Sequence, residues 1–211
     1  MHKPNRRELL GASFVAPLPS AWTGTRMNRL ADDGMAAARE RVRKHFLPSV
    51  PLLTQDGKKV RFYDDLVKDK IVIINFTYTR CAGVCPGITS NLVRVQRLLG
   101  DRVGRDIFMY SITLKPEEDS PRALREYAKV HGVGPGWTFL SGNSDDIELL
   151  RRKLGFTNPN PEIDKDKSQH IGNLRYGNEP LCLWAACPGL AHPEWIAESI
   201  SWVDRSRVKK I

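Results

Sequence analysis

The segment Ile71–Phe76 constrains the fold of this chain more than any other, because it is a continuous run of mostly β-branched residues. Such a run is typical of a strand that is buried on both faces, in a sheet covered by helices. A loop with two cysteines follows the run, and Leu92, Val95 and Leu99 then recur at helical spacing. This order of strand, loop and helix predicts a layered α/β domain with the run at its centre.

The remaining segments alternate in the same way, so we expect an α/β domain of three layers, in which helices flank a central mixed sheet. Ser144 is expected to cap the helix that follows it. The predicted elements are a charged, exposed helical lead-in (25–47), a hairpin (51–63), strands at 106–114, 137–140 and 171–176, helices at 122–130, 145–154 and from 193 onward, and a polar loop at 158–169. The domain itself is expected to span 48–205, followed by a basic tail at 206–211.

The length and the charge of the chain narrow the classes of function. A chain of 211 residues can bury one sizeable core, so one domain with terminal extensions is expected. The net charge of +9 raises the question of an anionic partner. However, Lys and Arg alternate with Asp and Glu, and no basic run is interleaved with aromatic residues. The pattern therefore indicates a solvated basic surface and argues against a nucleic-acid partner.

Residues 1–24 resemble an export signal. The pair Arg6-Arg7 precedes the apolar stretch Leu9–Ala16, and small residues follow around Ala21, as in a twin-arginine signal. A frayed, partly helical tail is the alternative, because Pro17 interrupts the short apolar stretch. No stretch approaches the roughly 18 apolar residues that a transmembrane helix needs. We therefore expect a periplasmic or otherwise exported protein without a transmembrane helix.

Cys81 and Cys85 carry the most specific chemistry in the sequence. They follow a buried strand at the start of a helix, where free backbone N–H groups and the helix dipole stabilise a thiolate. Helical spacing of i and i+4 would put both sulfurs on one side, where they could close a disulfide or bind one soft metal ion. The alternative is a buried, unreactive pair or a permanent staple, which would contribute little because the loop is short.

The other cysteines and the histidines are less specific. Cys182 and Cys187 flank Trp184, and a local disulfide is the first interpretation, two buried free thiols the second, and an auxiliary copper or thiol-relay site the third. Among the five histidines, His170 stands out because it ends a long polar loop and precedes a predicted strand. Loops at strand ends can deliver a ligand to a site. Spacing alone still favours an exposed loop histidine over a metal ligand.

The segment Asn75–Pro86 resembles the signature of the Sco/SenC family, copper-handling thioredoxin-fold proteins involved in cytochrome c oxidase assembly. That signature is a CxxxCP loop after the first central strand, with a histidine about as far downstream as His170 lies from Cys85 (170 − 85 = 85). The segments 62–66 and 136–140 are also similar to the family. The resemblance covers roughly residues 48 to 203 and implies a thioredoxin-like fold.

The resemblance implies that Cys81, Cys85 and His170 bind one copper ion, as Cu(I) or Cu(II), and that the two cysteines form a disulfide when oxidised. It implies a monomeric copper-binding metallochaperone near the membrane, which is not an enzyme in the turnover sense. Its partners would be the copper-centre subunit of a respiratory oxidase and other periplasmic copper or thiol redox proteins. The better-known members carry an acidic residue and a hydroxyl residue where this chain has Gln169 and Ile171, which points to a divergent branch.

Two alternatives from other classes remain. A thiol–disulfide oxidoreductase would reduce a partner's cysteines, but its usual motif is CxxC, and the extra residue here argues mildly against a general catalyst. A thiol peroxidase of the same fold would need Thr three residues before the reactive cysteine. Position 78 is Tyr, with Thr at 77 and 79, so the peroxidase interpretation is weaker still.

Overall fold

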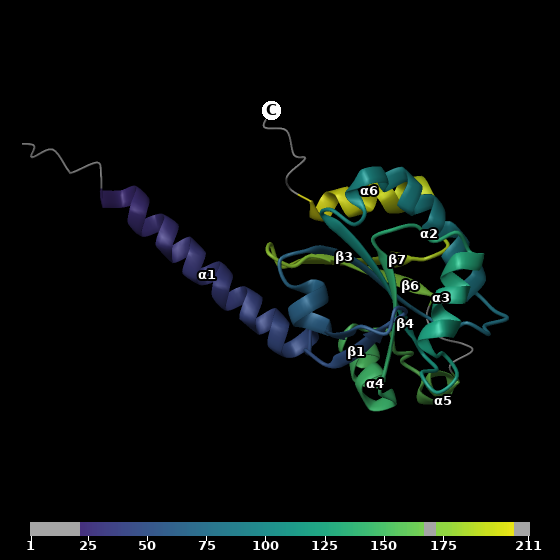
Figure 1. Ribbon diagram of the computed structural model, residues 1–211. Coiled ribbons are helices and arrows are strands. Elements are labelled where there is room, and N and C mark those ends of the chain that lie inside the picture. Colours follow the sequence, from purple (N-terminus) through teal and green to yellow (C-terminus); the bar gives the residue numbers. More distant parts are fainter. Residues whose placement is uncertain (1–21, 167–171, 205–211) are drawn as a thin grey trace, which may run out of the picture. The chain divides into compact units, whose positions relative to one another are not determined.

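The computed structural model describes residues 22–166 and 172–204 (Figure 1). The predicted signal up to residue 21, His170 and the basic tail lie outside the described residues. The first helix, α1 (Trp22–Phe46), runs through two compact units, of which the first ends at Met35 and the second begins at Ala36. The fold and the site described below belong to the second unit.

The second unit is built on a seven-stranded mixed sheet with the strand order β2-β1-β5-β4-β3-β6-β7. The pairs β3–β4 and β4–β5 are parallel, and all other neighbours are antiparallel. This arrangement confirms the predicted central mixed sheet. The strands are β1 (Pro51–Thr54), β2 (Lys59–Arg61), β3 (Ile71–Thr77), β4 (Ile107–Thr113), β5 (Trp137–Gly142), β6 (Asn173–Asn178) and β7 (Leu183–Pro188).

Helices cover both faces of the sheet, which confirms the three layers (Figure 1). One face packs against α2, α3 and α6, and the other packs against η1, α4 and the end of α1. The helices are η1 (Phe62–Val67), α2 (Cys85–Leu99), η2 (Gly100–Arg102), α3 (Pro121–Val130), α4 (Ser144–Lys153), α5 (Pro161–Lys165) and α6 (Pro193–Val203).

The strand β3 confirms the first prediction from the sequence, because all seven of its residues are buried. Its side chains alternate between the two cores: Val72 and Ile74 pack on the η1 and α4 side, whereas Ile71 and Ile73 pack on the α2 and α6 side. A strand between two layers of helices needs apolar residues on both faces, and the β-branched run supplies them.

Two predictions about individual elements are wrong, and one strand was missed. The polar loop at 158–169 contains a short helix, α5, which begins at Pro161 with Asn160 as its cap. The cap of α4 is Asn143, whose side chain accepts a hydrogen bond from the backbone N–H of Asp145, while Ser144 instead contacts the Glu117 carboxylate. The strand β7 was not predicted at all, because its sequence does not alternate and ends in Pro188.

Part of the predicted exposed lead-in contacts the domain, and Arg39 within it is only half-exposed. The Arg39 guanidinium contacts the Glu179 carboxylate at 2.5 Å and 3.0 Å, and Glu179 is only 2% exposed. Glu179 also accepts hydrogen bonds from the Tyr63 hydroxyl at 2.9 Å and from the Asp69 backbone N–H at 2.9 Å. We call this group of four residues the Glu179 anchor. It joins the second half of α1, η1, the turn before β3 and the β6–β7 turn around one buried carboxylate.

Candidate metal centre

The cysteine loop begins where β3 ends. Thr77, the last residue of β3, pairs with Thr113, the last residue of the parallel strand β4. The Asp119 carboxylate, only 1% exposed, accepts hydrogen bonds from the Thr113 hydroxyl at 2.5 Å and from the Thr79 hydroxyl at 2.5 Å. The backbone N–H of Thr79 also donates to it, at 3.2 Å. Asp119 therefore fixes the start of the cysteine loop to the end of the neighbouring strand.

The two thiols are buried side by side. Cys81 is 7% exposed and Cys85 is 2% exposed, and both pack in the core that η1 and α4 cover. The helix α2 begins at Cys85, so Cys81 precedes the helix, in the loop, and the predicted helical i, i+4 arrangement does not form. The two thiols nevertheless interact by a hydrogen bond. The structure thus brings the sulfurs together by a tight loop.

The environments of the two thiols move their pKa values in opposite directions. Burial would raise the pKa of Cys81, but hydrogen bonds from the Cys85 thiol and backbone N–H, the Tyr78 hydroxyl and the Gly83 N–H outweigh it, and the pKa is lowered. Burial, together with the neighbouring Cys81, raises the pKa of Cys85 to about 12. Cys81 is therefore the more readily ionised and more nucleophilic thiol of the pair, and Cys85 holds its proton at neutral pH.

This difference predicts selective alkylation of the reduced, metal-free protein. Iodoacetamide is expected to modify Cys81 first, with a rate that rises with pH through a midpoint below the ordinary thiol value of 9.0, because only the thiolate reacts. Cys85 should stay unmodified until the solution approaches pH 12. Peptide mass spectrometry at a series of pH values measures both rates.

The matched control for this prediction is Tyr78→Phe. The substitution removes one hydrogen-bond donor to Cys81 and should move the midpoint of its alkylation to higher pH. Equal rates for the two cysteines across the pH range would contradict the assignment of Cys81 as the thiolate.

The second cysteine pair does not form the predicted local disulfide. Both Cys182 and Cys187 are free thiols. Cys182 lies in the β6–β7 turn and Cys187 lies five residues further along the extended strand β7. At about 3.3 Å per residue their Cα atoms are roughly 16 Å apart, well beyond the ~7 Å that a disulfide spans. The same separation prevents the two sulfurs from sharing a metal ion.

The donor set of the cysteine loop suits a soft metal. Two thiolates favour copper(I), and an added imidazole suits copper in either oxidation state. Among the residues that the structure describes, no three His, Cys, Asp or Glu side chains form a group that could hold a metal ion. The predicted third ligand, His170, lies outside the described residues, so the three-ligand site stays a prediction.

Tyr78 and Asp119 are site residues that the sequence did not predict. Tyr78 entered only as an argument against a peroxidase, yet its hydroxyl interacts with Cys81, and burial raises its own pKa. Asp119 follows β4, the parallel neighbour of β3. The carboxyl ends of parallel strands meet at one edge, so a short polar side chain just beyond β4 was the available signal.

The fold and the cysteine loop define a class: a thioredoxin-like protein whose close cysteine pair lies between the central strand and the helix that follows it. Comparison with known families then gives the family. A family model described as SCO1/SenC matches residues 38–173. The chain belongs to the SCO1/SenC family.

Two relatives are similar to this chain. A candidate copper-binding protein of Stutzerimonas stutzeri is 28% identical over 171 residues, which cover 80% of this chain and 80% of the relative. The SCO1 protein homolog of Bacillus subtilis is 30% identical over 101 residues, 47% of this chain and 51% of the relative, so this match spans about half of that protein.

Two solved structures illustrate the likeness of the fold. The crystal structure of yeast Sco1 with copper bound has a TM-score of 0.59 at 21% identity and covers 77% of this chain and 96% of that one. The structure of BsSco, described with a disulfide switch and as a member of the Sco family of cytochrome c oxidase assembly proteins, has a TM-score of 0.62 at 21% identity. It covers 76% of this chain and 94% of that one.

Proposed function

We propose that this protein is a copper-binding metallochaperone that assists assembly of the copper centre of cytochrome c oxidase. The observation that carries the proposal is the buried, hydrogen-bonded pair Cys81 and Cys85 at the carboxyl end of β3. Family membership supports it, as do the copper-bound yeast Sco1 structure and the oxidase-assembly description of BsSco.

In this proposal copper is cargo, held by the Cys81 and Cys85 sulfurs and by the His170 imidazole. Asp119 positions the loop through Thr79, and Tyr78 donates a hydrogen bond toward the Cys81 sulfur. These groups orient the ligands without binding the metal themselves, as outer hydrogen-bond partners commonly do.

A direct test is the copper(I) stoichiometry of the reduced protein. We expect about one copper(I) per chain after reduction, and none in the cysteine site when Cys81 and Cys85 are oxidised to a disulfide, because thiolates bind the metal. His170→Ala should weaken binding by about tenfold or more and alter the thiolate-to-copper(II) charge-transfer band. Competition with a copper(I) chelator measures the affinity.

The matched control is His192→Ala, because the His192 side chain is 92% exposed and its only recorded partner among the described residues is Glu194. It should leave affinity and spectrum unchanged. If His170→Ala and His192→Ala behave alike, His170 is not a ligand.

The second candidate function is thiol–disulfide exchange with a partner's cysteines. The opposed pKa shifts of Cys81 and Cys85 favour it, because a lowered pKa supplies the attacking thiolate. In this exchange the Cys81 sulfur attacks a partner disulfide. Cys85 then displaces the partner, which leaves as a dithiol while Cys81 and Cys85 become a disulfide. Reduction of a partner disulfide at full rate without copper would favour this function over metal delivery.

We further propose that the protein is exported to the periplasm, by a twin-arginine-like signal in residues 1–24. The Arg6-Arg7 pair and the apolar stretch that follows support this. None of the helices that the structure describes is both long and apolar enough to cross a membrane.

A further inference from the structure

A cavity of about 380 Å³ lies on the face of the sheet that carries α4. None of the residues that line it takes part in the proposed function. Its floor is the β6–β7 hairpin, where Trp184 pairs with Gly177 and packs its ring against it. A Cβ at position 177 would lie 2.4 Å from the Trp184 ring, so only glycine allows this packing. The volume is within the range of pockets that hold small molecules.

The walls of the cavity are apolar and come from three separate elements. Val42 and Phe46 belong to the end of α1, Leu154 follows α4, and Trp184 lies in β7. Phe46 is 57% exposed, which is unusual for a large apolar side chain in a packed wall. An apolar ligand body would cover this surface and remove it from water.

Arg175 gives the cavity its chemical specificity. Its guanidinium is half-buried, and burial lowers its pKa. Nε donates to the Leu154 carbonyl at 3.0 Å, and Nη2 lies over Gly155, where a Cβ would be only 2.6 Å away. Within the described residues Arg175 has no carboxylate partner. A half-buried cation without a counter-ion is costly, so an anion beside Arg175 would be strongly favoured.

The other polar groups around the cavity agree with an anionic ligand. Lys153 and Arg152 also line it, and its lining contains no acidic residue among those described. Arg152 forms an ion pair with Glu148, at 2.8 Å, whereas Lys153 has no ion pair with any residue that the structure describes. The Trp184 indole nitrogen is buried and lacks a hydrogen-bond acceptor within the described residues. The charged side chains that line the cavity are therefore all basic.

From this arrangement we propose that the cavity binds an apolar monocarboxylate, such as a free medium-chain fatty acid. The carboxylate is held by the Arg175 guanidinium, whose planar fork matches a carboxylate, and the chain lies along Val42, Phe46 and Trp184. This binding is independent of the copper site and does not require the proposed function to be correct.

The test is a calorimetric titration of the full-length protein with decanoate at neutral pH, with 1-decanol as the uncharged probe. We expect saturable decanoate binding near one equivalent and clearly weaker binding of decanol. Arg175→Gln should weaken decanoate binding by about tenfold or more, since hydrogen bonds to charged groups are the stronger ones. The same substitution should leave decanol binding unchanged.

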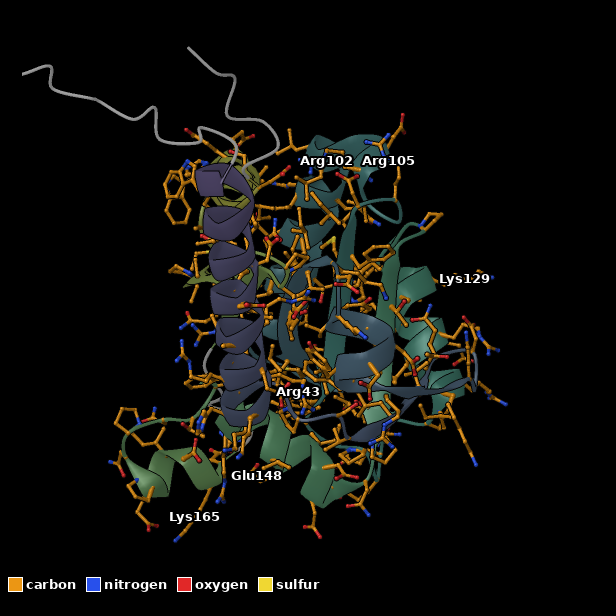
Figure 2. The ribbon with its side chains drawn as sticks, turned by 90° about the vertical axis from the view of Figure 1, so that its left-hand side faces the viewer. Arg43, Arg102, Arg105, Lys129, Glu148 and Lys165 are labelled. Carbon is orange, nitrogen blue, oxygen red and sulfur yellow. The ribbon has the colours of Figure 1, made fainter. Side chains whose placement is uncertain are left out.

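The matched control is Arg105→Gln, because Arg105 is 69% exposed and lies far from the cavity. Figure 2 shows it at the opposite end of the domain from Glu148, the ion-pair partner of the cavity residue Arg152. It should leave decanoate binding unchanged. Cys81→Ser should also leave it unchanged, which separates this proposal from the copper site. If Arg175→Gln does not fold by circular dichroism, Val42→Trp supplies the second test: it fills the cavity and should abolish binding of both probes.

Three outcomes would overturn the proposal. The first is the absence of saturable decanoate binding, which is also the result expected if another part of the chain already fills the cavity. The second is equal affinity for decanoate and decanol. The third is an equal loss of decanoate binding in Arg175→Gln and Arg105→Gln, which would reveal attraction to the basic surface as a whole.

Discussion

Replacing Cys81 with serine is expected to lower the affinity of the reduced protein for copper(I) by about 100-fold or more. Loss of groups that only orient metal ligands typically costs about 10- to 100-fold in affinity, and Cys81 would be lost as a ligand itself. Serine keeps the size of the side chain and can still use the Tyr78 hydroxyl as a partner, so the loop should keep its shape. Chelator competition on the reduced protein measures the change.

Cys182→Ser is the control for this prediction. Cys182 is a free, half-buried thiol in the β6–β7 turn and should contribute nothing to copper binding. Unchanged affinity in Cys182→Ser with a large loss in Cys81→Ser supports the cysteine-loop site. Copper that stays bound at full affinity in Cys81→Ser would place the metal elsewhere and end the metallochaperone proposal as stated.

Replacing Glu179 with alanine is expected to lower the free energy of unfolding by about 3 kcal/mol, the lower end of the range for breaking a buried ion pair. The lower end applies because the Arg39 side chain is 29% exposed and can recover some hydration. The Tyr63 hydroxyl and the Asp69 backbone N–H would also lose their acceptor. Urea denaturation followed by circular dichroism measures the change.

Asp69→Asn is the matched control, because Asp69 contacts the same guanidinium at 2.6 Å but is 62% exposed. Exposed ion pairs contribute between about 0 and 1 kcal/mol, so this change should be small. Asn also tolerates the positive φ of 61° at this position. Equal destabilisation by both substitutions would show that burial of Glu179 does not set the strength of the anchor.

The sequence predicted the centre of the fold well and its edge poorly. The strand β3 is buried on both faces, so its composition alone identified it. The strand β7 lies at the end of the sheet and is only partly buried, so its residues carry no clear period. Its pairing with β6 depends on tertiary contacts, such as that of Trp184 with Gly177, and these have no local signature.

The candidate site was predictable to a similar degree. The cysteines stood out because the loop that carries them follows a buried strand, but their separate pKa shifts depend on burial and on Tyr78, which the sequence does not reveal. Asp119 lies 40 residues from Thr79 in the chain. Only the parallel register of β3 and β4 explains why the two residues meet. The role of His170 rests on resemblance and awaits its experiment.

The raised pKa of Cys85 has a consequence for how cargo would be exchanged. At neutral pH this thiol holds its proton, so a metal ion that takes its sulfur must expel that proton into the surroundings. Uptake of copper is then coupled to acid release, and apparent affinity should change about tenfold for each pH unit from this proton alone. Local acidification would thus favour unloading, and an alkaline setting would favour capture, without any rearrangement of the fold.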